Sequence, residues 1–568
     1  MIQDKTYKII FSYLLILFGL SIFINNYLQF NKKISLISIF IFFFSIFIYF
    51  SLGKKEHINV EPSLNTPLFV ILIFLTTIVT QNVNLNFETL DWDIHSYLVV
   101  AMDIDRGYIP LENQWESKGP LLFYLYNLFY KLSFKNFVYF KIVNDLILFL
   151  ISLLLLFTVS KKSRRVSVGG VSSSFLFIIL MGQTFAQAEY SEVYSLLFIS
   201  AAYYFLSSKK INKRNLFIVS TLFSLSTLVN QGAVLFVFGF LFYLFLIDFN
   251  YIKNNYKNIL IGLSLPHLFF LIIYIINNLF FVYKATYIDI PLGYTAASLS
   301  STKELVIFLR SYFNFDIFTY TTLIFLISIF ILLVFVKRSS LLINNLFKLT
   351  IINIFISLIF YFVGSHNYYH HLFFLLYFLC FVPSLFENNN IKILIFFLIL
   401  SSSISVSFKS FDRSFHNLKN VDTLLENYPL YQASKLIEEN FSGEYNVFAL
   451  DYVAVLHYLD KANFSYIVHP SNHFEPYIAD TLIKANKIES DEVNKAILRS
   501  PDVILCSGTK IISGKVTKET NFNCAISDWN KKYISLDTKV FKENKNLSFY
   551  YDPYRPIGIY FKLETMTP

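Results

Sequence analysis

The sequence predicts a polytopic α-helical membrane protein that carries a soluble α/β domain at its C-terminal end. Two observations predict the membrane part: 55% of the 568 residues are hydrophobic and 15% are charged, and the mean hydropathy is +0.53. An ordinary soluble protein carries roughly 25% charged residues. A third observation, the return of charged and polar residues after residue 408, predicts the soluble domain.

We expect about thirteen transmembrane helices in residues 1–408, because a helix needs about 20 mostly apolar residues to cross the hydrocarbon core. The apolar runs are 9–29, 34–52, 66–80, 138–160, 171–187, 193–208, 215–229, 232–249, 258–283, 317–336, 341–364, 368–387 and 391–408. The runs 215–229 and 232–249 are separated by Asn230 and Gln231, and they also fit a single bent element.

The basic residues predict the orientation. With the N-terminus inside, seventeen Lys and Arg residues lie on the inner side, and the short outer loops hold two, Lys32 and Lys33. The positive-inside rule therefore predicts a cytoplasmic N-terminus. It places the loops 81–137 and 284–316, and everything after about residue 409, on the outer side. The net charge of +9 comes from these clusters and does not indicate a nucleic-acid partner.

Residues 409–568 have the pattern of an α/β domain. Strands are expected at 445–450, 502–506, 547–551 and 557–563, and helices at 430–440 and 491–500. Cys506 and Cys524 both lie in this domain, so a disulfide between them is expected if the compartment is oxidising.

The outer loop 81–137 contains the most informative residues. Asp91 and Asp93 follow an apolar run in "LDWDIHSYLVV", and "GPLLFYLYNLFYKL" follows Lys118. We expect one or two helical turns over 95–104, lying on the membrane. The second stretch fits an interfacial or re-entrant helix, because Tyr and Phe favour that depth. Alternatively, the acidic residues have no catalytic task and only keep this loop in water.

The order of residues in this loop resembles the first outer loop of the PMT-type glycosyltransferases, which are glycosyltransferase family 39-like and have the GT-C fold. These include the protein O-mannosyltransferases and the lipid A aminoarabinose transferases. The matching residues are an Asp at the membrane edge, a Tyr four residues later, a Gly-x-x-Pro and a Lys-Gly-Pro-Leu element: Asp93, Tyr97, Gly107 with Pro110, and Lys118 to Leu121. Many members follow the Asp with Glu, where this chain has Ile94.

Two later stretches are similar to the bacterial members. "AEYSEVYSLLF" at 188–198 places Glu192 at the acidic position of their second outer turn, and "GSHNYYHHLFFLLYFLCFVP" at 364–383 places Tyr368 and His370 in their late Tyr-x-His element. Residues 445–470 resemble the outer C-terminal domain of some members. The similarity therefore runs in order along nearly the whole chain.

The resemblance implies a GT-C-like catalytic domain that transfers a sugar, with inversion, from a polyprenyl-phosphate donor to a lipid, glycan or protein acceptor. Asp93 would be the general base and Lys118 would hold the donor phosphate. The other predicted substrate-binding residues are Asp91, Tyr97, Arg106, Glu116, Glu192, Tyr368 and His370. The physical chemistry agrees with this implication: a carboxylate can take the acceptor proton, and a cation can stabilise charge on the leaving phosphate. The protein would be a multi-pass protein of the bacterial inner membrane.

Alternative interpretations stay open for three groups of residues. Asp91-Trp92-Asp93 has the Asp-x-Asp form that binds a divalent cation in nucleotide-sugar enzymes. His366, His370 and His371 could form a metal cluster, contact substrate or support a helix end. We expect no cofactor, with a divalent metal as the minor alternative. Lys141 and Asp145 are expected to form an ion pair at the membrane edge, although intramembrane charges are often functional.

Two other functional classes make different predictions for the sequence. A transporter or flippase of lipid-linked glycans would have charges deep within facing helices and inverted repeats, and the sequence shows neither clearly. A structural or sensor protein would leave the acidic outer loop unexplained.

Overall fold

The computed structural model describes most of the middle of the chain and parts of its C-terminal third. The described residues are 63–160, 166–182, 188–207, 212–247, 249–297, 345–362, 368–381, 384, 399, 410–441, 443–507, 511–512, 515–516, 533–535 and 557–562. The predicted spans 9–29, 34–52 and 317–336, nearly all of 391–408, and the predicted strand 547–551 lie outside these residues.

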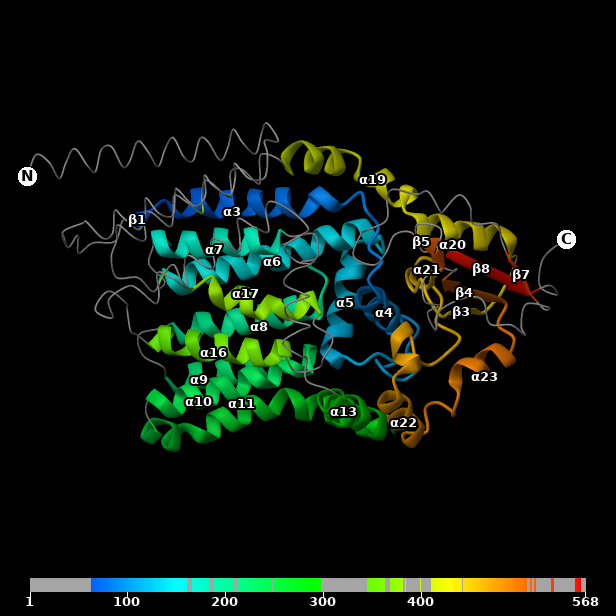
Figure 1. Ribbon diagram of the computed structural model, residues 1–568. Helices are drawn as coiled ribbons and strands as arrows, with labels where there is room; N and C mark the ends of the chain where they lie inside the picture. Colours follow the sequence, from blue (N-terminus) through cyan, green and yellow to red (C-terminus); the bar gives the residue numbers. More distant parts are fainter. Residues whose placement is uncertain are drawn as a thin grey trace, which may run out of the picture.

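Apolar helices run side by side through one half of the molecule (Figure 1). They are α3 (Thr66–Gln81), α6 (Phe137–Val159), α7 (Val168–Met181), α8 (Ser191–Leu206), α9 (Lys213–Val229), α10 (Val234–Ile247), α11 (Phe249–Ile276), α16 (Asn345–Phe362) and α17 (Phe373–Leu379). Within the described residues, three helical stretches, 66–84, 137–159 and 252–276, are long and apolar enough to cross a membrane, and five apolar helices are shorter. These helices and the composition support a membrane protein, whereas the count of thirteen spans stays a prediction.

The predicted runs 215–229 and 232–249 form two helices rather than one bent element. A short 3-10 turn (Gln231–Ala233) joins α9 to α10. Phe223 in α9 stacks on Phe240 in α10 with ring centroids 4.9 Å apart. Since these two residues lie on opposite sides of the turn, the helices fold back on each other.

The helix expected at 258–283 begins and ends earlier than its apolar run. α11 starts at Phe249 and includes the polar stretch up to Asn258. It ends at Ile276, and Asn278 has a positive φ of 58°, a conformation that Asn tolerates and most side chains do not. A short helix α12 (Phe280–Lys284) occupies the end of the predicted run. A π-helical turn (Ala285–Asp289) and α13 (Ile290–Ala297) follow in the part of the loop 284–316 that the structure describes.

Two short helices of the loop 81–137 lie at one end of the long helices (Figure 1). α4 (Trp92–Met102) contains the expected helical turns, and α5 (Pro120–Leu132) contains the expected helix after Lys118. Pro120 occupies the first turn of α5, where its missing N–H is not needed. α4 is largely buried and packs against α21 (Ala454–Tyr458) of the C-terminal part, whereas α5 packs against α4, α6 and α9 and leaves Leu128 and Leu132 exposed.

The C-terminal part contains a four-stranded mixed sheet. Its order is β3 (Val447–Ala449), β4 (Val503–Ser507), β8 (Ile557–Lys562) and β7 (Tyr533–Ser535). β3 is parallel to β4, with Val447 opposite Val503, whereas β8 is antiparallel to both β4 and β7. Two further pairs of two-residue strands are antiparallel: β1 (Ser63–Leu64) with β2 (Val166–Ser167), and β5 (Ile511–Ile512) with β6 (Lys515–Val516).

Helices accompany the sheet: α19 (Val421–Leu424), α20 (Pro429–Asn440), α21 (Ala454–Tyr458), α22 (Pro476–Lys484) and α23 (Glu492–Leu498). The predicted helices at 430–440 and 491–500 correspond to α20 and α23, and three of the predicted strands correspond to β3, β4 and β8. Cys506 in β4 is disulfide-bonded, whereas Cys380 is free. Cys524, the predicted partner of Cys506, lies outside the described residues.

The outer loop and the C-terminal part are joined by backbone hydrogen bonds. Trp115 N–H donates to the Tyr466 carbonyl at 2.8 Å, and Val468 N–H donates to the Trp115 carbonyl at 3.2 Å. The Trp115 indole is fully buried and donates to the Thr286 hydroxyl at 2.8 Å. Residues 463–475 are therefore held against the loop that carries Asp93 and Lys118.

Candidate active site

Asp91 caps the N-terminus of α4. Its Oδ1 accepts hydrogen bonds from the backbone N–H groups of Asp93 at 2.9 Å and Ile94 at 3.4 Å. Its Oδ2 accepts from the Tyr190 hydroxyl. Asp is favoured at this position because its carboxylate satisfies N–H groups that have no partner within the helix. Asp91 is buried, and both of its oxygens are used within the protein.

Asp93 lies in the first turn of α4 and faces two histidines from distant parts of the chain. Its Oδ1 lies 3.1 Å from Nε2 of His469, and its Oδ2 lies 3.7 Å from Nε2 of His370. Its side chain is 21% exposed. Of the two carboxylates, Asp93 is therefore the one that a substrate can reach.

The pKa values of the two carboxyl groups are shifted in opposite directions. Burial and the charge of Asp93 raise the pKa of Asp91 to about 7. Burial also acts to raise the pKa of Asp93, but the hydrogen bond and charge of His469, with the charge of Lys118, outweigh it and hold that pKa well below its usual range. Burial lowers the pKa of His469, but the hydrogen bond to Asp93 and the charge of Glu116 raise it above its ordinary value. Asp93 is thus an ionised carboxylate paired with a basic imidazole.

Lys118 lies in the turn before α5. Its ammonium lies 5.8 Å from the centroid of the Tyr97 ring, and within the described chain it makes no hydrogen bond or ion pair. Burial lowers its pKa, but four nearby carboxylates outweigh this effect and raise it. These carboxylates are Glu192, Asp93, Glu116 and Asp91. Lys118 is therefore charged, and its donors are available to an anion.

The turn that carries Lys118 is fixed against the end of α9. Gly119 N–H donates to the Val229 carbonyl at 3.3 Å, and the Gln231 side chain donates to the Ser117 carbonyl at 2.9 Å. A Cβ atom on Gly119 would lie 2.0 Å from the Leu228 carbonyl oxygen. Glycine therefore suits this position of the Lys-Gly-Pro motif, because the turn packs directly against the backbone of α9 and leaves no room for a side chain.

Glu192 and Glu116 are buried carboxylates held by amide side chains. Glu192, in the first turn of α8, accepts from Nδ2 of Asn230 at 2.8 Å. Glu116 accepts from Nδ2 of Asn472 at 3.0 Å and from the Ser117 hydroxyl at 2.8 Å. Burial raises the pKa of Glu116. Glu192 and Glu116 thus lie near Lys118 and Asp93. For Glu192, which is distant from them in the sequence, only the fold establishes this proximity.

Three predicted aromatic or imidazole residues lie around the same charges. Tyr97 is buried in α4, packs edge-on against Tyr126, and its hydroxyl has no hydrogen-bond partner among the described residues. His370 lies in the 3-10 turn Tyr369–Leu372. Its ring stacks on the rings of Tyr190 and Tyr368, whose centroids are 4.6 Å and 5.3 Å from its own. The structure therefore brings Tyr97, Tyr368 and His370 to the Asp93 side of the molecule.

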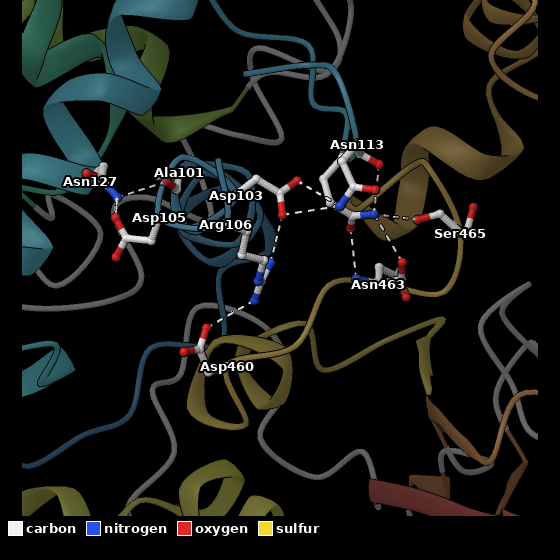
Figure 2. Close-up of polar contacts among 10 residues, drawn as sticks. Ala101, Asp103, Asp105, Arg106, Asn113, Asn127, Asp460, Asn463 and Ser465 are labelled. Atoms are coloured by element: carbon white, nitrogen blue, oxygen red, sulfur yellow. Dashed lines mark hydrogen bonds and ion pairs between the residues drawn. The ribbon is translucent and has the colours of Figure 1, made fainter. Parts of the chain in front are cut away.

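Arg106 is engaged elsewhere. Its guanidinium donates to Asp103 at 2.7 Å and to Asp460 at 3.1 Å, so it links the outer loop to the C-terminal part (Figure 2). In the same view, Asp105 accepts from Asn127 at 2.8 Å. Asp103 and Asp105 are thus held in local polar contacts rather than freely solvated.

The expected ion pair between Lys141 and Asp145 is not formed in the described part of the chain. The Lys141 ammonium donates instead to the Phe87 carbonyl at 3.3 Å. The spacing of four places both side chains on one face of α6, but the Phe87 carbonyl of the outer loop takes the ammonium instead.

Sequence reasoning missed His469, which makes the shorter of the two imidazole contacts with the Asp93 carboxylate. The two residues are separated by most of the chain, and no motif in the sequence connects them. Tyr190, Asn230 and Asn472 were also missed, although each follows or precedes a predicted element. Their side chains donate hydrogen bonds to carboxylates of the site: Tyr190 to Asp91, Asn230 to Glu192 and Asn472 to Glu116.

A group of side chains in this cluster has donor types that suit a metal ion. Glu192, His370 and His371 each offer one ligand atom, and these atoms lie within 4.8 Å of one another. The predicted cluster of His366, His370 and His371 includes His366, which lies outside the described residues. Among the described residues, the arrangement can therefore bind an anion at Lys118, accept a proton at Asp93 and offer three ligands to a cation.

Comparisons with known proteins give little support beyond this geometry. No family profile matches the chain, and no curated protein matches it in sequence. The chain is similar to the crystal structure of ArnT from Cupriavidus metallidurans bound to undecaprenyl phosphate, with a TM-score of 0.46 and 12% identity over 88% of this chain and 99% of that chain. The apo-state structure of the same protein gives a TM-score of 0.39 and 10% identity over 77% of this chain and 91% of that chain. Because both TM-scores are low, this likeness carries no argument, and the functional proposal rests on the chain's own site.

Proposed function

We propose that the protein is a membrane glycosyltransferase that moves a sugar from a polyprenyl-phosphate donor to an acceptor on the outer face of the membrane. One observation supports this proposal most strongly. Asp93, an ionised and partly exposed carboxylate, lies in the same cluster as Lys118, a charged ammonium that makes no ion pair within the described chain. A proton acceptor and an anion site are thus adjacent at the end of apolar helices.

The proposed step is a single displacement at the anomeric carbon of the donor. The acceptor oxygen attacks from the face opposite the phosphate, so a new carbon–oxygen bond forms while the bond to the phosphate oxygen breaks. The bonding electron pair leaves with the polyprenyl phosphate, and the acceptor proton passes to Asp93. The configuration at the anomeric carbon is inverted.

Asp93 and Lys118 have different tasks in this step. The low pKa of Asp93 keeps it ionised at physiological pH, as a base must be, but it also makes Asp93 a weak base. General-base catalysis contributes about 10²–10⁴-fold, and the phosphate ester supplies a leaving group that is already good. Lys118 stabilises the charge that collects on the phosphate oxygen as the bond breaks.

The remaining predicted residues have separate proposed roles. Glu116, Glu192, Tyr368 and His370 are proposed to contact the donor or the acceptor. Asp91 is proposed to position Asp93 through the start of α4, since its oxygens bond Asp93 N–H and Tyr190. Tyr97 and Arg106 are proposed to shape the loop, the first beneath Lys118 and the second at Asp460.

The location of the site explains the choice of donor. Apolar helices end beside α4 and α5 (Figure 1), and the positive-inside rule assigns this end to the outer face. Nucleotide sugars are not available there, whereas a lipid-linked sugar is. We therefore propose a bacterial inner-membrane location, with the carrier chain lying against the apolar helices.

The test is an assay of the purified protein in detergent or nanodiscs with a panel of polyprenyl-phosphate sugars. The proposal predicts release of free polyprenyl phosphate that depends on an added membrane extract as the acceptor source. Movement of an intact lipid-linked sugar between leaflets, without release of the carrier phosphate, would instead identify a flippase.

A further inference from the structure

We propose that Glu192, His370 and His371 form a binding site for one divalent cation of the zinc class, beside Asp93. One ligand atom from each residue lies within 4.8 Å of those of the other two. A carboxylate with two imidazoles is a set that binds zinc in catalytic sites, where three protein ligands leave one position open. The role of the ion described below rests on the proposed function, whereas the binding site does not.

The first supporting observation is an unsatisfied nitrogen. His370 is 5% exposed, and its Nδ1 has no hydrogen-bond partner among the described residues. Its Nε2 is 3.7 Å from Asp93, which is longer than a hydrogen bond. Buried polar atoms without a partner are uncommon and costly, and coordination of a cation by the imidazole would remove this cost.

The second observation is that the ligands are held in place. Tyr190 and Tyr368 stack on the His370 ring, and Phe360 packs edge-on against His371 at 5.1 Å. Glu192 accepts from Asn230 at 2.8 Å and from the Ser191 hydroxyl at 3.1 Å. Each carboxylate oxygen keeps a further lone pair, so these bonds orient Glu192 without preventing it from binding a metal. Hydrogen bonds of this kind are typical around metal ligands.

The third observation is the balance of charge. Four carboxylates, those of Asp91, Asp93, Glu116 and Glu192, lie near two basic side chains, Lys118 and His469. A divalent cation would offset this excess of negative charge. Because Oδ2 of Asp93 lies 3.7 Å from Nε2 of His370, the ion would lie close to the proton acceptor. There the ion would accept a phosphate oxygen of the donor and, with Lys118, stabilise the leaving group.

The experiment measures zinc binding to the purified full-length protein, carrying an affinity tag without histidine or cysteine. The protein is stripped with a chelator, dialysed against buffered zinc chloride and analysed for zinc per chain. One zinc per chain is expected for the wild type. Glu192→Gln, His370→Asn and His371→Asn should each weaken binding by at least about 10-fold, the typical effect of disturbing a metal site. His416→Gln is the matched control, because His416 is an exposed histidine in the segment 410–419.

A second measurement guards against variants that bind poorly because they fold poorly. His371→Cys replaces an imidazole by a thiolate, which is also a zinc and cobalt ligand. With cobalt(II) as the probe, this variant should gain a sulfur-to-cobalt charge-transfer band that the wild type lacks, even though the wild type contains the free Cys380.

The outcomes separate this inference from the proposed function. Equal zinc binding by the wild type and all three ligand variants overturns the inference, and so does a wild type that binds no zinc, whether or not it releases polyprenyl phosphate. Zinc binding that depends on the three ligands, in a protein that releases no polyprenyl phosphate from any donor, supports the metal site and counts against the proposed function.

Discussion

Asp91 and Asp93 are two residues apart, yet their carboxylates have different neighbours. Asp91 bonds backbone N–H groups and the Tyr190 hydroxyl, whereas Asp93 meets two imidazoles and is partly exposed. The "DWD" sequence is compatible with a helix cap, because Asp is a preferred capping residue. What no pattern could reveal was the partner of Asp93. His469 comes from another part of the chain, and only the fold brings the two together.

At Lys118 we predict that substitution affects donor binding as well as turnover. The ammonium would contact the donor phosphate in both the ground state and the transition state. Lys118→Ala should therefore weaken donor binding by roughly 10- to 100-fold, which corresponds to about 1.5–3 kcal/mol for a charged hydrogen bond. Titration of the purified variant with a polyprenyl-phosphate sugar measures the effect. Lys131→Ala is the control, since Lys131 pairs with Asp105 at 2.5 Å. Unchanged donor affinity in Lys118→Ala would remove Lys118 from the phosphate site.

At the scale of the elements, the conformation of the turn before α5 requires a glycine at residue 119. A Cβ atom at residue 119 would meet the Leu228 carbonyl oxygen at 2.0 Å, and a backbone atom of α9 cannot move aside easily. Gly119→Ala should shift the turn and with it Lys118. A displacement of about 1 Å can cost about 100-fold in rate, so turnover should fall by that order. Gly182→Ala is the control, because its added Cβ would meet nothing closer than 3.3 Å. Wild-type turnover in Gly119→Ala would show that the contact is not required.

Glu88 connects the outer loop to the first turn of α20. Its Oε2 accepts from Leu430 N–H at 2.7 Å, while its buried Oε1 has no hydrogen-bond partner in the described chain. Burial raises the pKa of Glu88 from its ordinary value of 4.5 to about 8. Between these values the folded protein holds a proton that the unfolded chain has lost.

Unfolding therefore releases a proton in this range, and rising pH favours unfolding. The stabilising contribution of Glu88 is full below about pH 4.5 and is lost as pH rises to about 8, with a slope of about 1.4 kcal/mol per pH unit. Glu88→Gln keeps an acceptor for Leu430 but cannot ionise, so its melting temperature should fall less between pH 5 and 8 than that of the wild type. The comparison is made by thermal unfolding in detergent at several pH values, with the exposed Glu438→Gln as control. Parallel pH profiles for Glu88→Gln and wild type would contradict the assignment.

The long apolar helices were largely predictable, because α3, α6, α8 and α9 follow runs of apolar residues within a few positions. Predictions failed where polar residues continue a helix. α11 begins in "FNYIKNNYKN", which reads as a loop by hydropathy but is helical in the structure. Helix formation depends on backbone hydrogen bonding and propensity, and hydropathy reports neither.

At the scale of the whole molecule, the C-terminal part completes the site. His469 and Asn472 contact Asp93 and Glu116, and Trp115 pairs with the backbone of 466–468. A site divided in this way requires the C-terminal part to lie on the same side of the membrane as the outer loop. The charge bias of the loops predicts that side to be the outer one.

The orientation is tested with a reporter that is active only in the cytoplasm, fused after the last residue. The expected result is no signal, because residues 409–568 are predicted to lie outside. A fusion of the same reporter after Arg165, in a basic inner loop, should be active and serves as the control. A bright C-terminal fusion would reverse the topology and remove the reason for a lipid-linked donor.

The most direct test of the central claim is the rate of polyprenyl phosphate release by the Asp93→Asn variant. The account predicts that Asp93→Asn binds the donor but turns over at least about 100-fold more slowly than the wild type, the range of general-base catalysis. Asp91→Asn should lose much less, since an amide oxygen can still cap α4. Near wild-type release by Asp93→Asn, with Asp91→Asn inactive, would mean that the wrong carboxylate was chosen. Full activity of both variants would contradict the mechanism itself.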